Sequence, residues 1–259
     1  MLTGEQQCRE EIVRIGRMMY ERGWIASTDG NISVRLDAAR ILATPTGICK
    51  GAMTPDDPII CDMEGNRLSG TRHCTTEMPM HVAVYKERPE IRAVVHAHPP
   101  TATGFAVAGK ALNLGVLPEL IVSFGSVPLA EYGLPGTPAL VDGMLPFIPK
   151  YNAILLANHG AVAYAEDLVH AFARMETVEH LARIMVVAET LGGPKLLPRA
   201  EITKLFEARA RYGVRVPNQF EPGNPVAAED VPESDEKFEI TRRQLMSIID
   251  EALRVRGMV

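Results

Sequence analysis

The chain has 259 residues, a length that fits one large domain or one domain with an extension. Apolar residues make up 46% of it, enough for a sizeable core, and the formal net charge is −5. This acidic balance, with no cluster of Lys and Arg, argues against a nucleic-acid or anionic-membrane partner, since both present phosphates that need a basic face. The polar N-terminus and the lack of an apolar run of about 20 residues argue against a signal segment and a membrane span. We therefore expect a cytoplasmic protein.

The cysteines are widely spaced and form no C-x-x-C pair. In a chain of this size that pattern is typical of free thiols in a reducing cytosol. We therefore expect free thiols at Cys8, Cys49, Cys61 and Cys74.

Apolar periodicity predicts strands and helices that alternate along the chain. The first element is a helix at about 5–22, whose apolar residues recur at helical spacing and which ends at Gly23. Residues 31–36 alternate polar and apolar and predict a strand. The alternation of elements indicates an α/β fold, and periodicity alone favours a parallel sheet. The other predicted strands are 41–43, 92–98, 121–124 and 153–157, and the other predicted helices are about 75–86, 101–108, 166–191 and 201–211.

Residues 217–237 differ in composition from the rest of the chain. They contain four prolines and a run of acidic residues, which is typical of a linker. An amphipathic helix is expected after them. We therefore divide the chain into a domain at 1–216, a Pro/acid-rich linker at 217–237 and a C-terminal helix at 238–259.

His96 and His98 lie two positions apart on the predicted strand 92–98. Because strand side chains alternate between faces, both imidazoles point to the same side. Two such histidines need partners, and a shared metal ion satisfies both; zinc accepts three protein nitrogens and leaves one position open for chemistry. His159, at the end of the predicted strand 153–157, is the best third ligand. The alternative is a structural histidine pair at a strand end.

Three turns rich in hydroxyl groups and glycine occur in the first third of the chain, at 27–31, 44–47 and 75–76. Each offers backbone N–H groups with a hydroxyl or amide, and the third adds the positive end of a helix dipole, which suits a phosphate. Singly, such turns are usually only turns and caps, so they indicate an anion site only if the fold brings them together. Glu77 follows directly and is best explained, from sequence alone, as a favourable carboxylate in the first turn of a helix.

Five motifs together resemble the class II aldolase/adducin family, and within it the fuculose-1-phosphate aldolase type. Their order and spacing match over about residues 5–215. The motifs are Gly-Asn-Ile-Ser-Val-Arg at 30–35, Thr-Pro-Thr-Gly at 44–47, Thr-Thr-Glu at 75–77, Val-His-Ala-His at 95–98 and Asn-His-Gly at 158–160.

The resemblance implies a three-layer α/β/α domain with a central, mainly antiparallel sheet, in place of the parallel one. It also implies a cyclic homotetramer with active sites between subunits. The implied cofactor is Zn²⁺, or Mn²⁺ or another divalent metal in some relatives. Glu77 matches the family's acid/base residue, which also reaches the metal. The implied metal ligands are His96, His98, His159 and Glu77, and the implied phosphate cradle is Thr28, Asn31, Thr46, Gly47, Thr75 and Thr76.

Two more residues bear on the reaction. Residues 211–215 resemble a tail segment whose tyrosine closes over the site, so Tyr212 is a candidate catalytic residue. Glu119 stands where fuculose-phosphate enzymes have an aromatic residue and methylthioribulose-phosphate dehydratases have an acid/base glutamate. It is either catalytic or an exposed loop carboxylate.

The resemblance implies retro-aldol cleavage of a ketose 1-phosphate, such as a fuculose or 5-deoxyribulose 1-phosphate, to dihydroxyacetone phosphate and an aldehyde. A divalent metal would stabilise the enediolate as a Lewis acid. Glu77 would transfer the proton at the enediolate carbon, and Tyr212 or Glu119 the proton of the distal hydroxyl. The expected partner is therefore a phosphorylated sugar.

Other reactions remain open. The same site would serve a decarboxylase of an aromatic or sugar acid, or an enzyme like methylthioribulose-phosphate dehydratase. The alternative of another class is a non-catalytic, adducin-like interaction module. Such modules lack the three histidines that this chain has.

Overall fold

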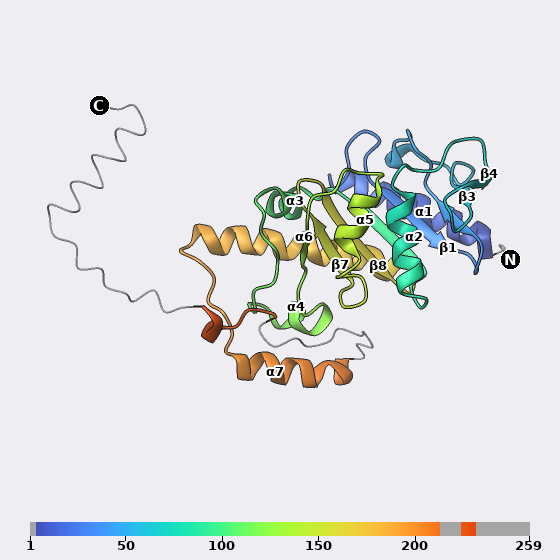
Figure 1. The fold of residues 1–259 in the computed structure, drawn as a ribbon. Coiled ribbons are helices and arrows are strands. Elements are labelled where there is room, and N and C mark those ends of the chain that lie inside the picture. The colour runs from blue at the N-terminus through green and yellow to red at the C-terminus, as the bar shows by residue number, and fades with distance from the viewer. Residues whose placement is uncertain (1–3, 213–223, 232–259) are drawn as a thin grey trace, which may run out of the picture. The chain divides into compact units, whose positions relative to one another are not determined.

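The computed structural model of the chain describes residues 4–212 and 224–231 (Figure 1). The chain divides into two compact units, Met1–Ala228 and Glu229–Val259. The helix expected at 238–259 and most of the linker at 217–237 lie outside the described residues. The predicted boundaries of domain, linker and C-terminal helix therefore stay predictions. Within the described residues no helix is both long and apolar enough to cross a membrane.

An eight-stranded sheet of described residues forms the centre of the first unit, in the order β4-β3-β2-β1-β5-β8-β7-β6 (Figure 1). All neighbouring pairs are antiparallel except β6 and β7. The mainly antiparallel sheet is thus confirmed and the parallel sheet favoured by periodicity is wrong, because apolar runs report burial and not strand direction. The strands are β1 (Asn31–Arg35), β2 (Ile41–Ala43), β3 (Ile59–Cys61), β4 (Arg67–Ser69), β5 (Ala93–Ala97), β6 (Leu129–Ala130), β7 (Ala153–Leu156) and β8 (Gly160–Ala165).

Helices cover both faces of the sheet, which confirms the three-layer α/β/α arrangement. One apolar core lies between the sheet and α1, α3 and α6, and a second lies between the opposite face and α2 and α5. Helices α4 and α7 pack against each other and share a smaller core. The helices are α1 (Gly4–Glu21), α2 (Met78–Glu87), α3 (Pro100–Val107), α4 (Pro118–Ser123), α5 (Pro138–Met144), α6 (Leu168–Thr190) and α7 (Arg199–Ala208), with short 3-10 turns at η1 (Lys50–Ala52), η2 (Arg209–Tyr212) and η3 (Ala228–Asp230).

The apolar run at 121–124, predicted as a strand, belongs mainly to helix α4. Pro118 occupies the first turn, where its fixed φ and missing N–H suit the start of a helix. Ile121 is buried in the small core with Ile202 of α7. A short apolar run in a strand and one in a buried helix have the same composition, so periodicity does not separate them.

Cys61 and Cys74 form a disulfide with their Cα atoms 7.0 Å apart, so the prediction of free thiols is wrong for these two. The sheet brings them together, since Cys61 ends β3 and Cys74 forms an isolated β-bridge with Pro45. Cys8 and Cys49 are free, as expected. The disulfide ties the segment that leads to Thr75 to β3, the strand next to the edge strand β4. The cytoplasmic location stays a prediction.

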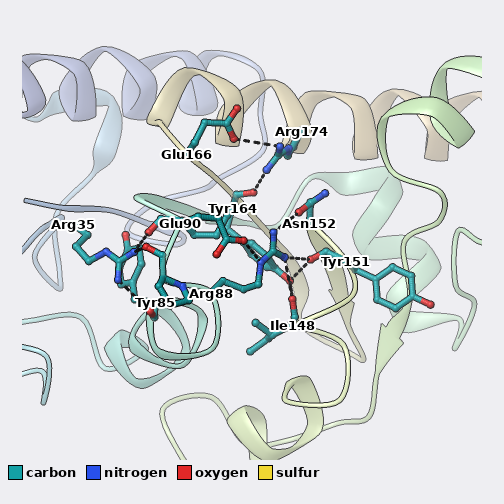
Figure 2. Close-up of polar contacts among 12 residues, drawn as sticks. Arg35, Tyr85, Arg88, Glu90, Ile148, Tyr151, Asn152, Tyr164, Glu166 and Arg174 are labelled. Carbon is teal, nitrogen blue, oxygen red and sulfur yellow. Dashed lines mark hydrogen bonds and ion pairs between the residues drawn. The ribbon is translucent and has the colours of Figure 1, made fainter. Parts of the chain in front are cut away.

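Figure 2 shows Arg35 at the end of β1, Arg88 after α2 and Arg174 on α6 with their polar partners. Arg88 is 5% exposed, and its guanidinium donates to backbone carbonyls in 148–151 and to Asn152 Oδ1 at 3.1 to 3.2 Å. It also pairs with Glu90 and lies over the ring of Tyr164. A buried guanidinium is tolerated when its donors are satisfied in this way. These contacts fix the C-terminal end of α2, whose N-terminal end reaches the candidate site.

Candidate active site

His96 and His98 lie at the C-terminal end of β5. His96 is fully buried, and its Nδ1 lies 2.9 Å from the carbonyl oxygen of Ala161. Because a carbonyl oxygen only accepts, Nδ1 carries the proton and Nε2 presents a lone pair. The Nε2 atoms of His96 and His98 are 3.1 Å apart, while His98 Nδ1 faces Asp29 Oδ2 at 3.7 Å. Both rings therefore direct Nε2 toward the same point.

His159 joins this pair from the turn between β7 and β8. The turn is tight, with Asn158 at a φ of +54°. The ring centroid of His159 lies 4.7 Å from that of His96 and 5.1 Å from that of His98. Each of the three residues offers a ligand atom, and these atoms all lie within 4.8 Å of one another. The fold thus brings together the histidines that the sequence singled out.

Glu77 stands at the N-cap of α2, but its carboxylate makes no capping hydrogen bond. It faces the histidines instead. Oε1 lies 3.1 Å from His159 Nε2, and Oε2 lies 3.4 Å from His96 Nε2. Oε2 also accepts a hydrogen bond of 2.7 Å from Asn31 Nδ2. A favourable interaction with the helix dipole therefore does not account for where this side chain points.

Electrostatics keep the carboxylate ionised and the buried imidazoles neutral. Burial raises the pKa of Glu77, but His96, His159 and the Asn31 hydrogen bond outweigh it and hold that pKa well below its usual range. Burial lowers the pKa of His96 to about 3 and also lowers the pKa of His98. Ionised carboxylate and unprotonated imidazole are the forms in which these residues bind metal ions.

The donor set fits a divalent cation. Among the described residues, Glu77 Oε1 is a buried acceptor without a hydrogen-bond donor. The Nε2 atoms of His96 and His98 face each other at 3.1 Å, where two lone pairs repel unless a proton or cation lies between them. Three imidazole nitrogens and a carboxylate form a common ligand set for Zn²⁺ and are accepted by Mn²⁺.

The polar turns gather beside Glu77. The backbone N–H of Thr46 donates to the carbonyl of His73 at 3.0 Å, which places the turn 44–47 against the segment leading to Thr75. Asn31 Nδ2 lies 3.3 Å from Thr75 Oγ1. The fold therefore meets the condition that single turns leave open. It brings the turns at 27–31 and 75–76 into contact and places the turn at 44–47 against the segment before Thr75. The phosphate cradle of Thr28, Asn31, Thr46, Gly47, Thr75 and Thr76 stays a prediction.

Lys50 is a neighbour of these turns that the sequence does not single out. It is only 2% exposed, and its ammonium donates to the carbonyl oxygen of Thr28. Burial lowers the pKa of Lys50 to about 8, and the nearby carboxylate of Asp29 opposes this shift. Its position three residues after Gly47 is the only signal in the sequence. A positive charge thus lies at the edge of the gathered turns.

His81 is a second such neighbour, for which the sequence predicts only a place on a helix face. It is fully buried, and its Nε2 lies 2.5 Å from Asn31 Oδ1. Here a signal exists. Glu77 and His81 are four residues apart, a spacing that puts both on one face of a helix.

The other two candidate catalytic residues have no demonstrated place here. Glu119 is exposed in the first turn of α4, and within the described part of the chain its carboxylate makes no hydrogen bond or ion pair with Glu77 or the histidines. Tyr212 ends the turn η2, and its side chain lies outside the described residues.

Two glycines let the backbone pass close to the histidines. A Cβ atom on Gly30, which has a φ of +67°, would lie 2.8 Å from the carbonyl oxygen of His96. A Cβ atom on Gly160 would lie 2.5 Å from Cδ2 of His98. Only glycine fits such close approaches without a shift of its neighbours. The Gly-Asn and His-Gly steps of the sequence motifs therefore have a packing cause.

Known proteins resemble this chain in both sequence and fold. Residues 10–186 match the family described as Class II Aldolase and Adducin N-terminal domain. The chain is 34% identical over 210 residues to a 5-deoxy-D-ribulose 1-phosphate aldolase from Bacillus thuringiensis serovar kurstaki, which covers 80% of this chain and 98% of that protein. It is also 34% identical over 192 residues to a 3-oxo-tetronate 4-phosphate decarboxylase from Haemophilus influenzae, which covers 73% of this chain and 90% of that protein.

A solved structure of an L-fuculose 1-phosphate aldolase has the same fold, with a TM-score of 0.72 and 32% identity. The match covers 80% of this chain and 97% of that structure. The chain thus spans nearly the whole length of relatives that are named as aldolases and decarboxylases. The protein is a lyase that belongs to the class II aldolase and adducin family.

Proposed function

We propose that this protein is a metal-dependent aldolase that cleaves a ketose 1-phosphate of the 5-deoxyribulose or fuculose type to dihydroxyacetone phosphate and an aldehyde. The observation that carries the proposal is the position of the Glu77 carboxylate, within 3.4 Å of two imidazoles and next to the gathered turns. Metal-assisted cleavage of a sugar phosphate uses an acid/base group near both a cation site and an anion site. The named aldolase relatives support the same reaction.

The cation would be held by His96, His98 and His159, and by Glu77 when no substrate is present. Zn²⁺ is the first candidate, and Mn²⁺ or another divalent ion the second. When bound, the cation acts as a Lewis acid for the negative charge that develops on the ketone oxygen of the substrate. The carbonyl of Ala161 holds the His96 ring in the tautomer that this role requires.

Glu77 would handle the proton on C3 of the substrate. In the condensation direction, the ionised carboxylate removes a proton from C3 of dihydroxyacetone phosphate. By microscopic reversibility it returns that proton to C3 during cleavage, while the C4 hydroxyl loses its proton as the aldehyde forms. Tyr212 or Glu119 would take the C4 hydroxyl proton.

The gathered turns would bind the phosphate. Their backbone N–H groups and hydroxyls are neutral donors, and Lys50 adds a positive charge beside Thr28. Because charge-assisted hydrogen bonds are stronger than neutral ones, Lys50 would contribute more than any single hydroxyl. Anchoring the phosphate fixes the reacting carbons relative to Glu77.

Decarboxylation is the second candidate function. Relatives named 3-oxo-tetronate 4-phosphate decarboxylases share 31 to 34% identity with this chain. Loss of CO₂ beside a ketone also leaves negative charge on the ketone oxygen, so the same residues would serve. Dehydration of a methylthioribulose-phosphate-like substrate stays open through Glu119.

A substrate panel separates these functions. The purified protein is loaded with Zn²⁺ or Mn²⁺ and incubated with 5-deoxyribulose 1-phosphate, fuculose 1-phosphate and 3-oxo-tetronate 4-phosphate. Aldehyde and CO₂ are measured, because dihydroxyacetone phosphate is a product of both reactions. We expect aldehyde from a ketose 1-phosphate. CO₂ release from 3-oxo-tetronate 4-phosphate, with no aldehyde from either ketose 1-phosphate, would overturn the proposal in favour of decarboxylation. No metal binding and no product would indicate an adducin-like module.

We also propose a cyclic homotetramer in the cytoplasm. The tetramer follows from the family resemblance, in which the active sites lie between subunits, and the location from the polar N-terminus and the lack of a long apolar run in the sequence. Light scattering of the purified protein tests the assembly, with four copies of the 28.3 kDa chain expected.

A further inference from the structure

A chain of hydrogen bonds leads from Glu77 into the interior between β1 and α2. Its members, from the site inward, are Glu77, Asn31, His81, Ser33 and Tyr85. Asn31 Nδ2 lies 2.7 Å from Glu77 Oε2, and His81 Nε2 lies 2.5 Å from Asn31 Oδ1. Ser33 Oγ lies 2.7 Å from both His81 Nδ1 and the Tyr85 hydroxyl. Asn31, Ser33, His81 and Tyr85 are all buried.

This chain of hydrogen bonds forms because the repeat of helix α2 and the repeat of strand β1 have similar lengths. Glu77, His81 and Tyr85 recur every four residues, which is about 6.0 Å along a helix. Asn31 and Ser33 are two residues apart, which is about 6.6 to 6.8 Å along a strand. The residues between and after them on β1 face the other core, so this pair faces α2. Each step along the helix therefore meets one step along the strand.

The direction of every hydrogen bond follows from Glu77. An ionised carboxylate only accepts, so Asn31 must turn its Nδ2 toward it, which leaves Oδ1 for His81. His81 Nε2 must then carry the proton, and Nδ1 accepts from the Ser33 hydroxyl. Ser33 Oγ is then left to accept from the hydroxyl of Tyr85, which also lies 3.5 Å from the carbonyl oxygen of Arg92. No member is able to reverse alone without placing two donors or two acceptors face to face.

Burial keeps His81 and Tyr85, the two titratable groups inside the hydrogen-bond chain, uncharged. It lowers the pKa of His81 to about 4, so the ring is unprotonated at neutral pH. It raises the pKa of the Tyr85 hydroxyl above its usual range. The single tautomer of His81 is therefore fixed by its partners over the whole neutral range.

We propose that His81 is a positioning residue that acts through Asn31. It holds the Asn31 amide with both N–H groups directed at Glu77 and Thr75, and so holds the Glu77 carboxylate at the metal site. The catalytic part of this inference rests on the function proposed above. Without the His81 donor, the Asn31 amide is free to rotate and present its oxygen to the carboxylate, which repels it.

The main test compares His81→Leu with His81→Gln. Leucine fills similar space without polar atoms, while glutamine keeps both a donor and an acceptor. Loss of a residue that supports a metal ligand typically lowers activity or metal affinity by about 10- to 100-fold. We expect a fall of that size in kcat for His81→Leu, with a smaller change in KM, and recovery of most of it in His81→Gln. Parent-like kcat and KM in folded His81→Leu would overturn the inference.

Tyr85→Phe is a second test, and Tyr164→Phe is its matched control (Figure 2). Both tyrosines are buried, with relative exposures of 1% for Tyr85 and 0% for Tyr164. The Tyr164 hydroxyl donates to the carbonyl of Tyr151, which is not part of the hydrogen-bond chain. Each variant removes one buried hydroxyl, so their Tm values should fall by similar amounts. Only Tyr85→Phe should also lower kcat, by less than His81→Leu. An equal loss of kcat in Tyr164→Phe would mean that the hydrogen-bond chain contributes only to stability, and this would overturn the inference.

Two measurements do not depend on turnover. Nitrogen NMR of labelled protein should find His81 protonated at Nε2 and unprotonated at Nδ1. In Ser33→Ala the population of this tautomer should be lower. Competition with a chelator should find weaker Zn²⁺ binding in His81→Leu. A protonated Nδ1 in the wild type, or unchanged Zn²⁺ affinity, would overturn the inference even if the wild type cleaves none of the sugar phosphates. If no substrate of that panel is cleaved while both measurements agree with expectation, only the proposed function is overturned.

Discussion

Gly160 packs against His98 so closely that a Cβ atom on Gly160 would lie 2.5 Å from Cδ2 of the imidazole and 2.6 Å from the carbonyl oxygen of Ala97. Gly160 begins β8, so the strand that follows His159 passes directly over the His98 ring. The backbone of one strand thus limits the positions open to a side chain at the end of another.

Gly160→Ala should therefore weaken metal binding by displacing His98. We expect a loss of affinity of about 10- to 100-fold, as for other supports of metal ligands. Competition titration with a chelator measures it. Gly104→Ala in α3 is the control, because nothing lies within 4 Å of a Cβ atom there. Equal Zn²⁺ affinity in the two variants would contradict the close contact at Gly160.

Glu77→Gln should retain bound metal and substrate but lose about 10²- to 10⁴-fold in kcat, the usual contribution of acid/base catalysis. Glutamine keeps the shape and an oxygen for Asn31, but it carries no proton that can be exchanged with substrate carbon. Steady-state kinetics and metal analysis of the same preparation test this. Unchanged turnover would refute the role assigned to Glu77.

Chelation should abolish activity and lower Tm, and added Zn²⁺ or Mn²⁺ should restore both. A ligand that binds only the folded state stabilises it by about 2.7 kcal/mol at a free concentration of 100 Kd. A variant without His159 should show no such shift. An identical response to the ion in His159→Ala would mean that the metal binds elsewhere.

Lys50→Met should raise stability at pH 7 and weaken binding of the phosphorylated substrate. Burial lowers the pKa of Lys50 to about 8 in the folded protein, against about 10.4 in an unfolded chain. Between these values the unfolded state binds more protons, so the wild type gains stability as pH rises through this window. The Tm difference between Lys50→Met and wild type should therefore shrink from pH 7 to pH 10. A constant difference, or an unchanged KM, would contradict the respective part.

Cys74→Ser should loosen the segment that leads to Thr75. In the chain-entropy account, closing a loop of about 15 residues stabilises a fold by about 3 kcal/mol, and Cys61 and Cys74 are 13 residues apart. We expect a lower Tm and a higher KM for the sugar phosphate, and the same changes on reduction of the wild type. Cys49→Ser, at a free thiol, is the control. If reduction changes Cys74→Ser as much as wild type, the disulfide is not the cause.

Long, regular segments were predictable from the sequence. The helix at about 5–22 and the strands around Asn31 and His96 have clear periods, and they form α1, β1 and β5. The edge strands β4 and β6, and β3 next to β4, have two or three residues each, too few for a period. Strand β8 was not predicted. It follows β7 after a tight turn that Gly160 permits, and composition alone does not reveal that turn.

The candidate site was predictable where one motif carries the geometry and not where several segments meet. His-Ala-His on a strand predicts two imidazoles on one face, and the structure has them. The direction of the Glu77 side chain depends on Asn31 across a helix and a strand, so a local interpretation as a helix start was insufficient. The burial of Lys50 was not predictable, since its position three residues after Gly47 is the only signal and nothing local distinguishes a buried lysine from an exposed one.

The similar steps of β1 and α2, about 6.6 to 6.8 Å and about 6.0 Å, also restrict how this sequence can vary. The connection between them, residues 36–77, contains loops where insertions would leave the pairing of the two elements intact. One residue inserted between Glu77 and His81 would rotate one of them by about 100° around the helix, and one inserted between Asn31 and Ser33 would turn one of them to the opposite face. Relatives that keep this arrangement should therefore differ in length in the connection and not within either element.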